Sequence, residues 1–259
     1  MYKFHRILLF VFIFLGLTSC RTPKVTQTEV IKLQNSETKE GQLSITSASE
    51  TIRQKMLYSQ TYWKSLKVEG LSTSYIENEV PQIYHQQLWI VLPTKARILS
   101  GGPNDVPNYI WISNGENIFD NGQISVLPPY VKDPFYPPEI VGDTVYRYPL
   151  SMVMVSPFAD DIFPSGFAQR GGKYVPVKEE LIADRKALIV DWEGGTSNER
   201  FWIDIVTGVV LRDQVFYDKE KTKLNQELVV NYIQYDIEIS PDNFVLQMPN
   251  QMKFEDMSK

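Results

Sequence analysis

Cysteine and histidine are scarce in this chain, and their scarcity excludes several kinds of site. The 259 residues include one cysteine, Cys20, and two histidines, His5 and His85. A single cysteine permits no disulfide within the chain. Because His85 is the only histidine beyond the N-terminal segment, neither a multi-histidine metal site nor a His-x-x-x-His pair can form, and we expect no bound metal.

Sequence motifs for nucleotide binding and nucleophilic catalysis are absent as well. The chain has neither a Gly-x-x-x-x-Gly-Lys loop nor a Gly-x-Gly-x-x-Gly loop, so we expect no phosphate-binding loop and no cofactor. A Ser-His-Asp triad would have to use His85, and no Gly-x-Ser-x-Gly motif accompanies it. We expect His85 to lie at the surface, in a turn formed by Pro81–Gln86.

Pairs of carboxylates are the remaining residues that could support catalysis. Asp160-Asp161 and Glu179-Glu180 are adjacent pairs. Adjacent residues of a strand point to opposite sides, so neither pair would converge on one substrate. Solvated charge explains both pairs better than glycoside chemistry does. We therefore expect a protein that is not an enzyme, and a hydrolase acting on an envelope polymer is the alternative.

Basic residues are outnumbered by acidic ones. The chain has 26 Lys and Arg against 31 Asp and Glu, a net charge of −5. The N-terminal segment contains Lys3 and Arg6 and no acidic residue, so the chain that follows it is more acidic still. An acidic surface is repelled by phosphate, and we expect no nucleic acid as a partner.

The first residues have the pattern of an export signal. Met1–Arg6 is basic and Ile7–Leu15 is apolar, but this run is too short to span a bilayer, which requires about 20 apolar residues. Leu17-Thr18-Ser19-Cys20 resembles the lipobox of bacterial lipoproteins. The resemblance implies cleavage of residues 1–19 as a signal peptide and lipidation of Cys20. The alternative is an ordinary secretory signal in which Cys20 has no special role.

A lipidated Cys20 would attach the protein to a membrane of the cell envelope through its acyl chains. Arg21 is not the aspartate that retains such lipoproteins in an inner membrane. In a cell with two membranes we therefore expect the protein at the periplasmic face of the outer membrane. In a cell with one membrane we expect it at the extracellular face of the plasma membrane.

The rest of the chain divides into a tether and one domain. Residues 20–46 comprise Cys20 and a polar stretch without aromatic residues, which predicts a flexible tether. Residues 47–259 contain no linker and are expected to form a single domain. Ser47-Ala48-Ser49-Glu50 has the spacing of a capping box, so Ser49–Leu66 is predicted to be an amphipathic helix.

After Lys67 the sequence predicts a mainly β fold. Short runs of β-branched and aromatic residues alternate with turn signals, and Asn114-Gly115, Asn121-Gly122 and Thr207-Gly208 are typical of tight hairpins in an antiparallel sheet. So long a sheet must curl into a barrel or split into a sandwich. The predicted strands are Val68–Ile76, Gln87–Leu92, Tyr109–Ser113, Asn117–Asp120, Ile124–Leu127, Val145–Tyr148, Lys186–Trp192, Arg200–Ile205, Val209–Tyr217, Leu224–Tyr235 and Ile237–Ile239.

Two segments interrupt the strand pattern. Pro128–Pro138 has too many prolines for a central strand. Leu150–Val155, followed by Phe158, is strongly apolar, and Met152 and Met154 add adaptable side chains. These residues either cover an open end of the β core or form a lid over an apolar cavity.

A tight hairpin is predicted between two strong strands near the end of the chain. Trp202–Gly208 contains Asp204 and Thr207, whose side chains can hydrogen-bond the backbone of the turn. Gly208 can supply a positive φ. Leu211–Asp218 follows with the order Leu-Arg and then Tyr-Asp.

This order resembles the LolA/LolB-like superfamily of periplasmic lipid and lipoprotein carriers, which includes RseB-like sensors. In that superfamily a Trp-Ile-Asp-x-x-Thr-Gly hairpin is followed by Leu-Arg-x-x-x-Tyr-Asp, and Tyr232–Phe244 is similar to its closing strand. The resemblance implies a half-open antiparallel β-barrel with an amino-terminal helix and short covering helices or loops. It also implies a concave apolar face that takes up acyl chains.

Residues that could line such a cavity are large and apolar. The run Leu88–Leu92 is apolar on both faces, which predicts that both sides of the sheet are covered. The tryptophans could equally be ordinary core residues. The candidate lining residues are Trp89, Trp111, Met152, Met154, Phe158 and Trp202.

The expected function is that of a membrane-anchored envelope lipoprotein that binds a lipid, or the acyl chains of another lipoprotein, and carries it. One alternative is an RseB-like regulatory sensor, which would need a specific envelope protein as its partner. Another is a structural lipoprotein whose barrel is filled by its own side chains and binds no ligand.

Overall fold

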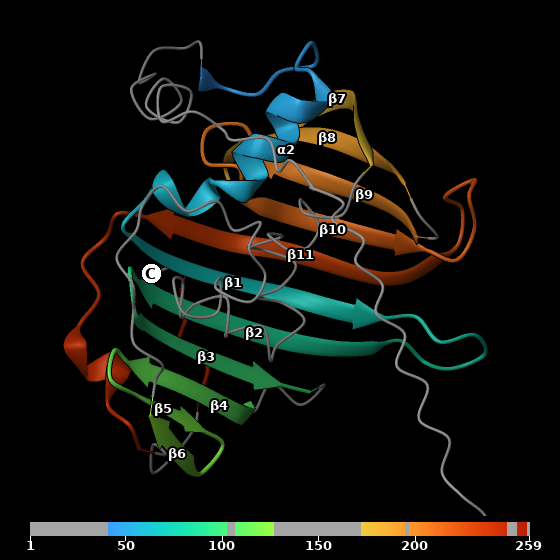
Figure 1. The fold of residues 1–259 in the computed structure, drawn as a ribbon. Coiled ribbons are helices and arrows are strands. Elements are labelled where there is room, and N and C mark those ends of the chain that lie inside the picture. The colour runs from blue at the N-terminus through green and yellow to red at the C-terminus, as the bar shows by residue number, and fades with distance from the viewer. Residues whose placement is uncertain (1–40, 103–106, 127–171, 195–196, 248–252, 258–259) are drawn as a thin grey trace, which may run out of the picture.

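One antiparallel sheet of eleven strands forms the fold (Figure 1). The computed structural model describes residues 41–102, 107–126, 172–194, 197–247 and 253–257. In chain order the elements are α2 (Ser49–Leu57), the 3-10 turn η2 (Ser59–Thr61), β1 (Ser65–Ser74), β2 (Gln82–Val91), β3 (Lys95–Gly101), β4 (Pro107–Asn114), β5 (Asn117–Asp120), β6 (Gln123–Val126), β7 (Lys173–Ile182), β8 (Arg185–Gly194), β9 (Ser197–Asp204), β10 (Val210–Phe216), β11 (Leu224–Tyr235) and the 3-10 turn η4 (Pro241–Phe244).

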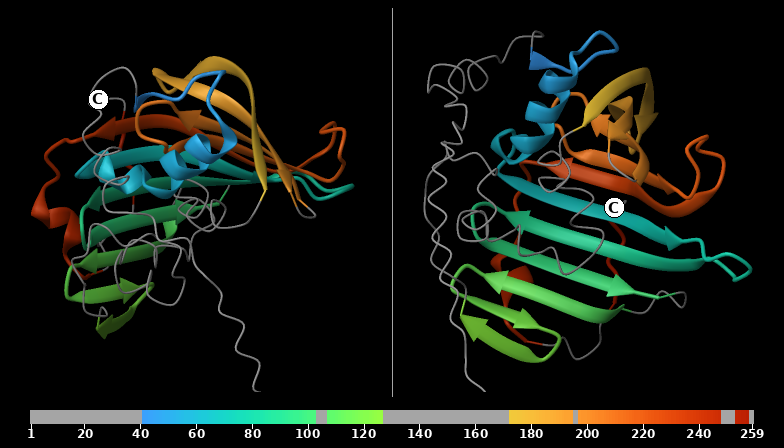
Figure 2. Two further views of the ribbon diagram at one scale, coloured as in Figure 1. Left: turned by 45° about the horizontal axis from the view of Figure 1, so that its top comes forward. Right: turned by 45° about the vertical axis from the view of Figure 1, so that its right-hand side comes forward.

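The strand order makes the sheet an open barrel. The order is β6-β5-β4-β3-β2-β1-β11-β10-β9-β8-β7, so the first strand pairs with the last and the middle of the chain supplies both edges. Figure 2 shows that the sheet is strongly curved. Among the described strands, β6 and β7 do not pair with each other, so the curved sheet stays open. The predicted mainly β, half-open antiparallel barrel with an amino-terminal helix is confirmed.

Three buried clusters hold these elements together. The largest joins residues of β1–β5 and β8–β11 and includes Trp63, just before β1. A second packs α2 against the β7–β10 end of the sheet. A third packs the C-terminal segment against β2–β5. Burial of apolar area on both sides of the sheet explains why strands such as β2 are apolar on both faces.

Helix α2 is shorter than predicted. It ends at Leu57 and is followed by η2, because Trp63 and Leu66 belong to the core of the sheet and the chain must extend into β1 there. The expected capping box is also wrong. The N-cap is Ala48, and the hydroxyl oxygen of Ser47 accepts from the backbone N–H of Ser44 at 2.9 Å instead of capping the helix.

Residues 41–46, which the sequence predicts as the end of the tether, pack on the domain. Leu43 is 2% exposed, and its backbone N–H donates to the carbonyl oxygen of Ile205 at 2.9 Å. The ammonium group of Lys55 donates to the carbonyl oxygen of Gly41 at 3.1 Å. The folded part of the chain therefore includes residues that precede the predicted domain.

Most predicted strands are present. The bounds of β5 and β11 match the prediction, but β3 and β7 were not predicted, and residues 237–239 form no strand. His85 lies inside β2 and not in a turn, 3.2 Å from Glu69. The predicted strand 145–148 and the segments 128–138 and 150–158 lie outside the described residues.

The C-terminal segment covers one side of β2–β5. Phe244 and Met257 are buried there with Trp89, Leu99 and the apolar residues of β4. The amide of Gln87 donates to the carbonyl oxygen of Glu255 at 2.6 Å, and the backbone N–H of Glu255 donates to Gln87 at 2.9 Å. These contacts hold residues 253–257, which form neither helix nor strand, against β2.

Candidate ligand-binding site

A pocket of about 800 Å³ lies at the end of the sheet where β1 begins. Its size falls within the range of roughly 300–1,000 Å³ that is usual for small-molecule sites. Three segments form it, namely the chain between η2 and β1, the end of β2 and the chain after β11. The lining residues are Thr61, Tyr62, Trp63, Lys64, Ser65, Val91, Leu92, Asp236, Ile237, Glu238 and Ile239.

Hydrogen bonds between distant parts of the chain hold these walls together. The backbone N–H of Lys64 donates to Oδ1 of Asp236 at 2.7 Å, and the hydroxyl of Ser65 donates to the carbonyl oxygen of Ile237 at 2.5 Å. The N–H of Leu92 donates to the carbonyl oxygen of Lys64 at 2.9 Å. Because every wall is bonded to another, the pocket is already formed without a ligand.

The pocket has an apolar wall and a charged rim. Trp63 belongs to the largest buried cluster, and Tyr62 and Leu92 pack against that cluster, so the wall continues into the core of the sheet. Lys64, Asp236 and Glu238 are exposed at the rim. An apolar group can enter such a pocket while polar groups stay at its mouth.

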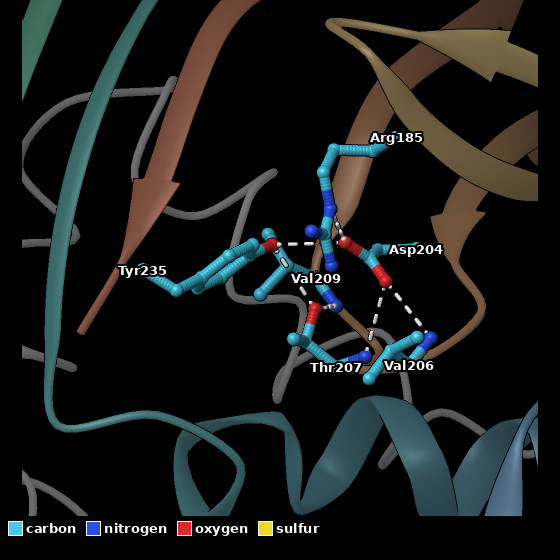
Figure 3. Close-up of polar contacts among 6 residues, drawn as sticks. All are labelled: Arg185, Asp204, Val206, Thr207, Val209 and Tyr235. Carbon is cyan, nitrogen blue, oxygen red and sulfur yellow. Dashed lines mark hydrogen bonds and ion pairs between the residues drawn. The ribbon is translucent and has the colours of Figure 1, made fainter.

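A buried polar cluster lies near the pocket, in the hairpin between β9 and β10 (Figure 3). Asp204, whose side chain is 1% exposed, accepts from the Nε–H of Arg185 at 2.9 Å and from the hydroxyl of Tyr235 at 3.3 Å through Oδ2. Its Oδ1 accepts from the backbone N–H groups of Val206 at 2.8 Å and Thr207 at 3.2 Å. The predicted role of Asp204 in the turn is confirmed.

The hydrogen bonds of Asp204 stabilise the hairpin and leave its carboxylate no free oxygen for catalysis. Both carboxylate oxygens are occupied, and Thr207 shares a hydrogen bond with Tyr235 at 3.0 Å. Burial raises the pKa of Tyr235 well above its usual value, and the charge of Asp204 raises it further. A neutral Tyr235 and a saturated Asp204 hold the hairpin to β11 and offer neither a nucleophile nor a free base.

Lys55 connects α2 to this cluster. It is 6% exposed, and its Nζ lies 3.4 Å from the centre of the Tyr62 ring. Burial lowers the pKa of Lys55 to about 8, and the charge of Asp204 opposes this shift. The same side chain thus contacts the end of the tether at Gly41 and a wall of the pocket at Tyr62.

The residues predicted to line a cavity do not lie together in one site. Trp111 and Trp202 belong to the largest buried cluster. Trp89 belongs to the cluster under the C-terminal segment and faces Arg97. Met152, Met154 and Phe158 lie outside the described residues, as does Cys20.

The wall residues around Trp63 were not predicted. Tyr62 and Trp63 were assigned to the predicted helix Ser49–Leu66, and their apolar character indicated burial but not a pocket. Among the described residues, no group of three or more His, Cys, Asp or Glu is placed to hold a metal ion. No helix in the described part of the chain is long and apolar enough to cross a membrane.

No protein-family profile matches this sequence, and no curated protein matches it. Several solved structures are similar in fold. The MucA/MucB complex of Pseudomonas aeruginosa contains a chain with 13% identity and a TM-score of 0.46, and the alignment covers 79% of this chain and 62% of that one. This chain therefore spans less than two thirds of that protein.

Two smaller proteins are similar over nearly their whole length. A LolA superfamily protein of Nitrosomonas europaea has 9% identity and a TM-score of 0.33, with 77% of this chain and 98% of that chain covered. LprF of Mycobacterium bovis has 10% identity and a TM-score of 0.38, with 75% and 97% covered. At these identities and scores the similarities establish neither a family nor a function.

Proposed function

We propose that this chain is a membrane-anchored lipoprotein of the cell envelope that binds a lipid, or the acyl chains of another lipoprotein, on the apolar side of its half-open barrel. One observation carries the proposal. The pocket at the start of β1 has an apolar wall of Tyr62, Trp63 and Leu92 that continues into the largest buried cluster. An acyl chain entering there would pack against this apolar wall, while its polar end would stay at the charged rim.

We propose a carrier and not an enzyme. Asp204, the buried carboxylate of the hairpin cluster, already accepts four hydrogen bonds. A general base needs a free lone pair directed at its substrate. The site therefore supports binding better than catalysis.

We propose that lipidated Cys20 anchors the domain. The chain between Cys20 and Gly41 would have an end-to-end distance of roughly 25 Å as a flexible coil. This length would let the domain stand off the headgroups while it remains close enough to exchange lipid with the membrane.

Native mass spectrometry of residues 21–259, followed by solvent extraction, tests the proposal. A lipid bound at a defined stoichiometry is the expected result. Ile237→Trp would narrow the pocket and should reduce the bound fraction. Val245→Trp introduces the same side chain at a residue outside the pocket that is 46% exposed, and it should leave the bound fraction unchanged. A protein that carries no lipid and does not take up a fluorescent fatty acid would overturn the proposal and favour a structural lipoprotein.

A further inference from the structure

A second pocket lies at the opposite end of β1 from the pocket beside Trp63. Its volume is about 540 Å³, and we call it the Tyr217 pocket. It lies where β1 ends and β11 begins, beside the β1–β2 and β10–β11 connections, which project from the same end of the sheet (Figure 1 and Figure 2). The lining residues are Tyr75, Ile76, Glu77, Tyr217, Lys223 and Leu224.

Hydrogen bonds hold the two connections together without a ligand. The hydroxyl of Tyr217 donates to the carbonyl oxygen of Tyr75 at 2.8 Å, and the backbone N–H of Tyr75 donates to the carbonyl oxygen of Asn225 at 2.8 Å. The N–H of Tyr217 donates to the carbonyl oxygen of Lys223 at 2.9 Å. Tyr217 is nevertheless 55% exposed, so the pocket has a fixed aromatic wall that a ligand can reach.

Two opposite charges line the Tyr217 pocket, and the protein neutralises neither of them. Glu77 and Lys223 are both exposed. Within the described part of the chain, neither the carboxylate of Glu77 nor the ammonium group of Lys223 has a hydrogen-bond or ion-pair partner. The nearby Lys221 differs, because its ammonium group lies 2.9 Å from Asp191. One free group of each sign in the same pocket favours a ligand that also carries both signs.

The uncharged walls of the pocket suit a small organic cation. An aromatic ring attracts a cation that lies over its face, and Tyr75 and Tyr217 supply two rings. Ile76 and Leu224 supply apolar contacts for the carbon atoms of the ligand. A phosphodiester of glycerol and an amino alcohol has an anionic phosphate, a nearby ammonium group and short carbon segments. This combination is the headgroup of a zwitterionic phospholipid.

The surface around the pocket favours a membrane over a free zwitterion. Val80 and Ile83, on the same β1–β2 hairpin, are 84% and 43% exposed. Aliphatic and tyrosine side chains can enter the interfacial layer of a membrane, where charged groups still contact the headgroups. The net charge of −5 opposes contact with anionic lipids, so zwitterionic lipids are the better match.

The chain before the domain is long enough to allow this contact. Gly41 is bonded to Lys55, which contacts the wall of the pocket beside Trp63 at Tyr62. The ten residues of β1 place the Tyr217 pocket about 30 Å further along the sheet. The chain from Cys20 to Gly41 spans up to about 70 Å when extended. A membrane that holds a lipidated Cys20 is therefore within reach of the Tyr217 pocket.

We propose that the Tyr217 pocket binds the headgroup of a zwitterionic phospholipid. The phosphate contacts Lys223, the ammonium group lies over the ring of Tyr217 and pairs with Glu77, and the carbon atoms between them contact the apolar walls. This contact holds the projecting end of the sheet at a membrane surface. The site is separate from the pocket beside Trp63, so the inference goes beyond acyl-chain binding and is tested without it.

Soluble headgroups without acyl chains test the site. Residues 21–259 are titrated with glycerophosphoethanolamine, glycerophosphoglycerol, ethanolamine and leucine, and binding is followed by NMR. Glycerophosphoethanolamine should bind at least about fivefold more tightly than the other three, because only this probe offers both a phosphate to Lys223 and an ammonium group to Glu77 and Tyr217. Equal affinities would overturn the headgroup class, and no binding of any probe would overturn the site.

The two connections offer a matched control for each charge. Lys223→Gln and Glu77→Gln should each weaken the binding of glycerophosphoethanolamine by about three- to fivefold. Lys219→Gln and Glu79→Gln remove exposed charges of the same connections outside the pocket and should leave the affinity unchanged. Equal losses in a pocket variant and its control would overturn the assigned contacts.

Vesicles distinguish a membrane from a free zwitterion. Residues 21–259 should co-sediment with vesicles of equal parts phosphatidylethanolamine and phosphatidylcholine, and Lys223→Gln should reduce the bound fraction while Lys219→Gln should not. Equal or stronger binding to phosphatidylglycerol vesicles would overturn the preference for zwitterionic lipid. Binding of the soluble headgroup without binding to vesicles would overturn the membrane contact and assign the pocket to a free zwitterion.

Discussion

Gly208 lies so close to Lys55 that a Cβ atom at residue 208 would be 2.2 Å from the carbonyl oxygen of Lys55. This approach brings the β9–β10 hairpin against the backbone of α2. The φ of Gly208 is +77°, a backbone conformation that residues other than glycine rarely adopt. Two independent constraints, space and backbone conformation, therefore require glycine here.

Gly208→Ala should destabilise the domain by about 2–3 kcal/mol, because both the contact with α2 and the backbone of the turn would be strained. The matched control is Gly122→Ala. Gly122 has a φ of +107° but nothing within 4 Å of its Cβ position, so only the backbone strain of about 1–2 kcal/mol applies. Urea denaturation measures both variants. Equal losses would show that the contact with Lys55 has no energetic role.

Asp204→Asn should cost about 2–4 kcal/mol of stability, because it leaves Arg185 without its buried counter-charge. Asp191→Asn is the control. Asp191 also pairs with Arg200 at 2.6 Å and Lys221 at 2.9 Å, but its side chain is 22% exposed, and the expected loss is below about 1 kcal/mol. A smaller loss for Asp204 than for Asp191 in urea denaturation would contradict the structural role of the buried cluster.

The sequence predicted those elements whose conformation depends on residues close together in the chain. The Asp204–Gly208 hairpin follows from turn residues that hydrogen-bond their own backbone, and the structure has those bonds. Strand β7 was not predicted because Pro176 and the charged residues Lys178–Glu180 interrupt the alternation of apolar and polar residues that is typical of a strand. Pairing with β8 stabilises the strand nevertheless. Pro176 is tolerated because β7 is an edge strand, and a bulge follows it between Pro176 and Lys178.

The site could be predicted only in part, because register decides which side chains meet. Trp89 is opposite Arg97 and Trp111 is opposite Ile98, and these are adjacent residues of β3. The two tryptophans therefore lie on different faces, although both are apolar residues of strong strands. The pocket wall depends on a bond between Lys64 and Asp236, which are 172 positions apart, and no local pattern reports such a contact.

Lys55 should make stability depend on pH in the alkaline range. Burial lowers its pKa in the folded protein to about 8, whereas an unfolded lysine has a pKa of about 10.4. Between these values the unfolded chain binds more protons, so the free energy of unfolding should rise with pH from about 8 to about 10.4. Lys55→Met should remove this rise of about 1–3 kcal/mol. Urea denaturation at several pH values measures the difference between the two proteins, and parallel pH profiles would contradict the lowered pKa.

Phe244 should be the main anchor of the C-terminal segment. It is 5% exposed and packs on β3 and β4, whereas its neighbour Val245 is 46% exposed. Phe244→Ala should cost about 3–5 kcal/mol and release the segment, so that the backbone N–H of Glu255 loses protection from hydrogen exchange. Val245→Ala should change stability by less than about 0.5 kcal/mol. Full protection of Glu255 in Phe244→Ala would show that the contacts with Gln87 hold the segment without Phe244.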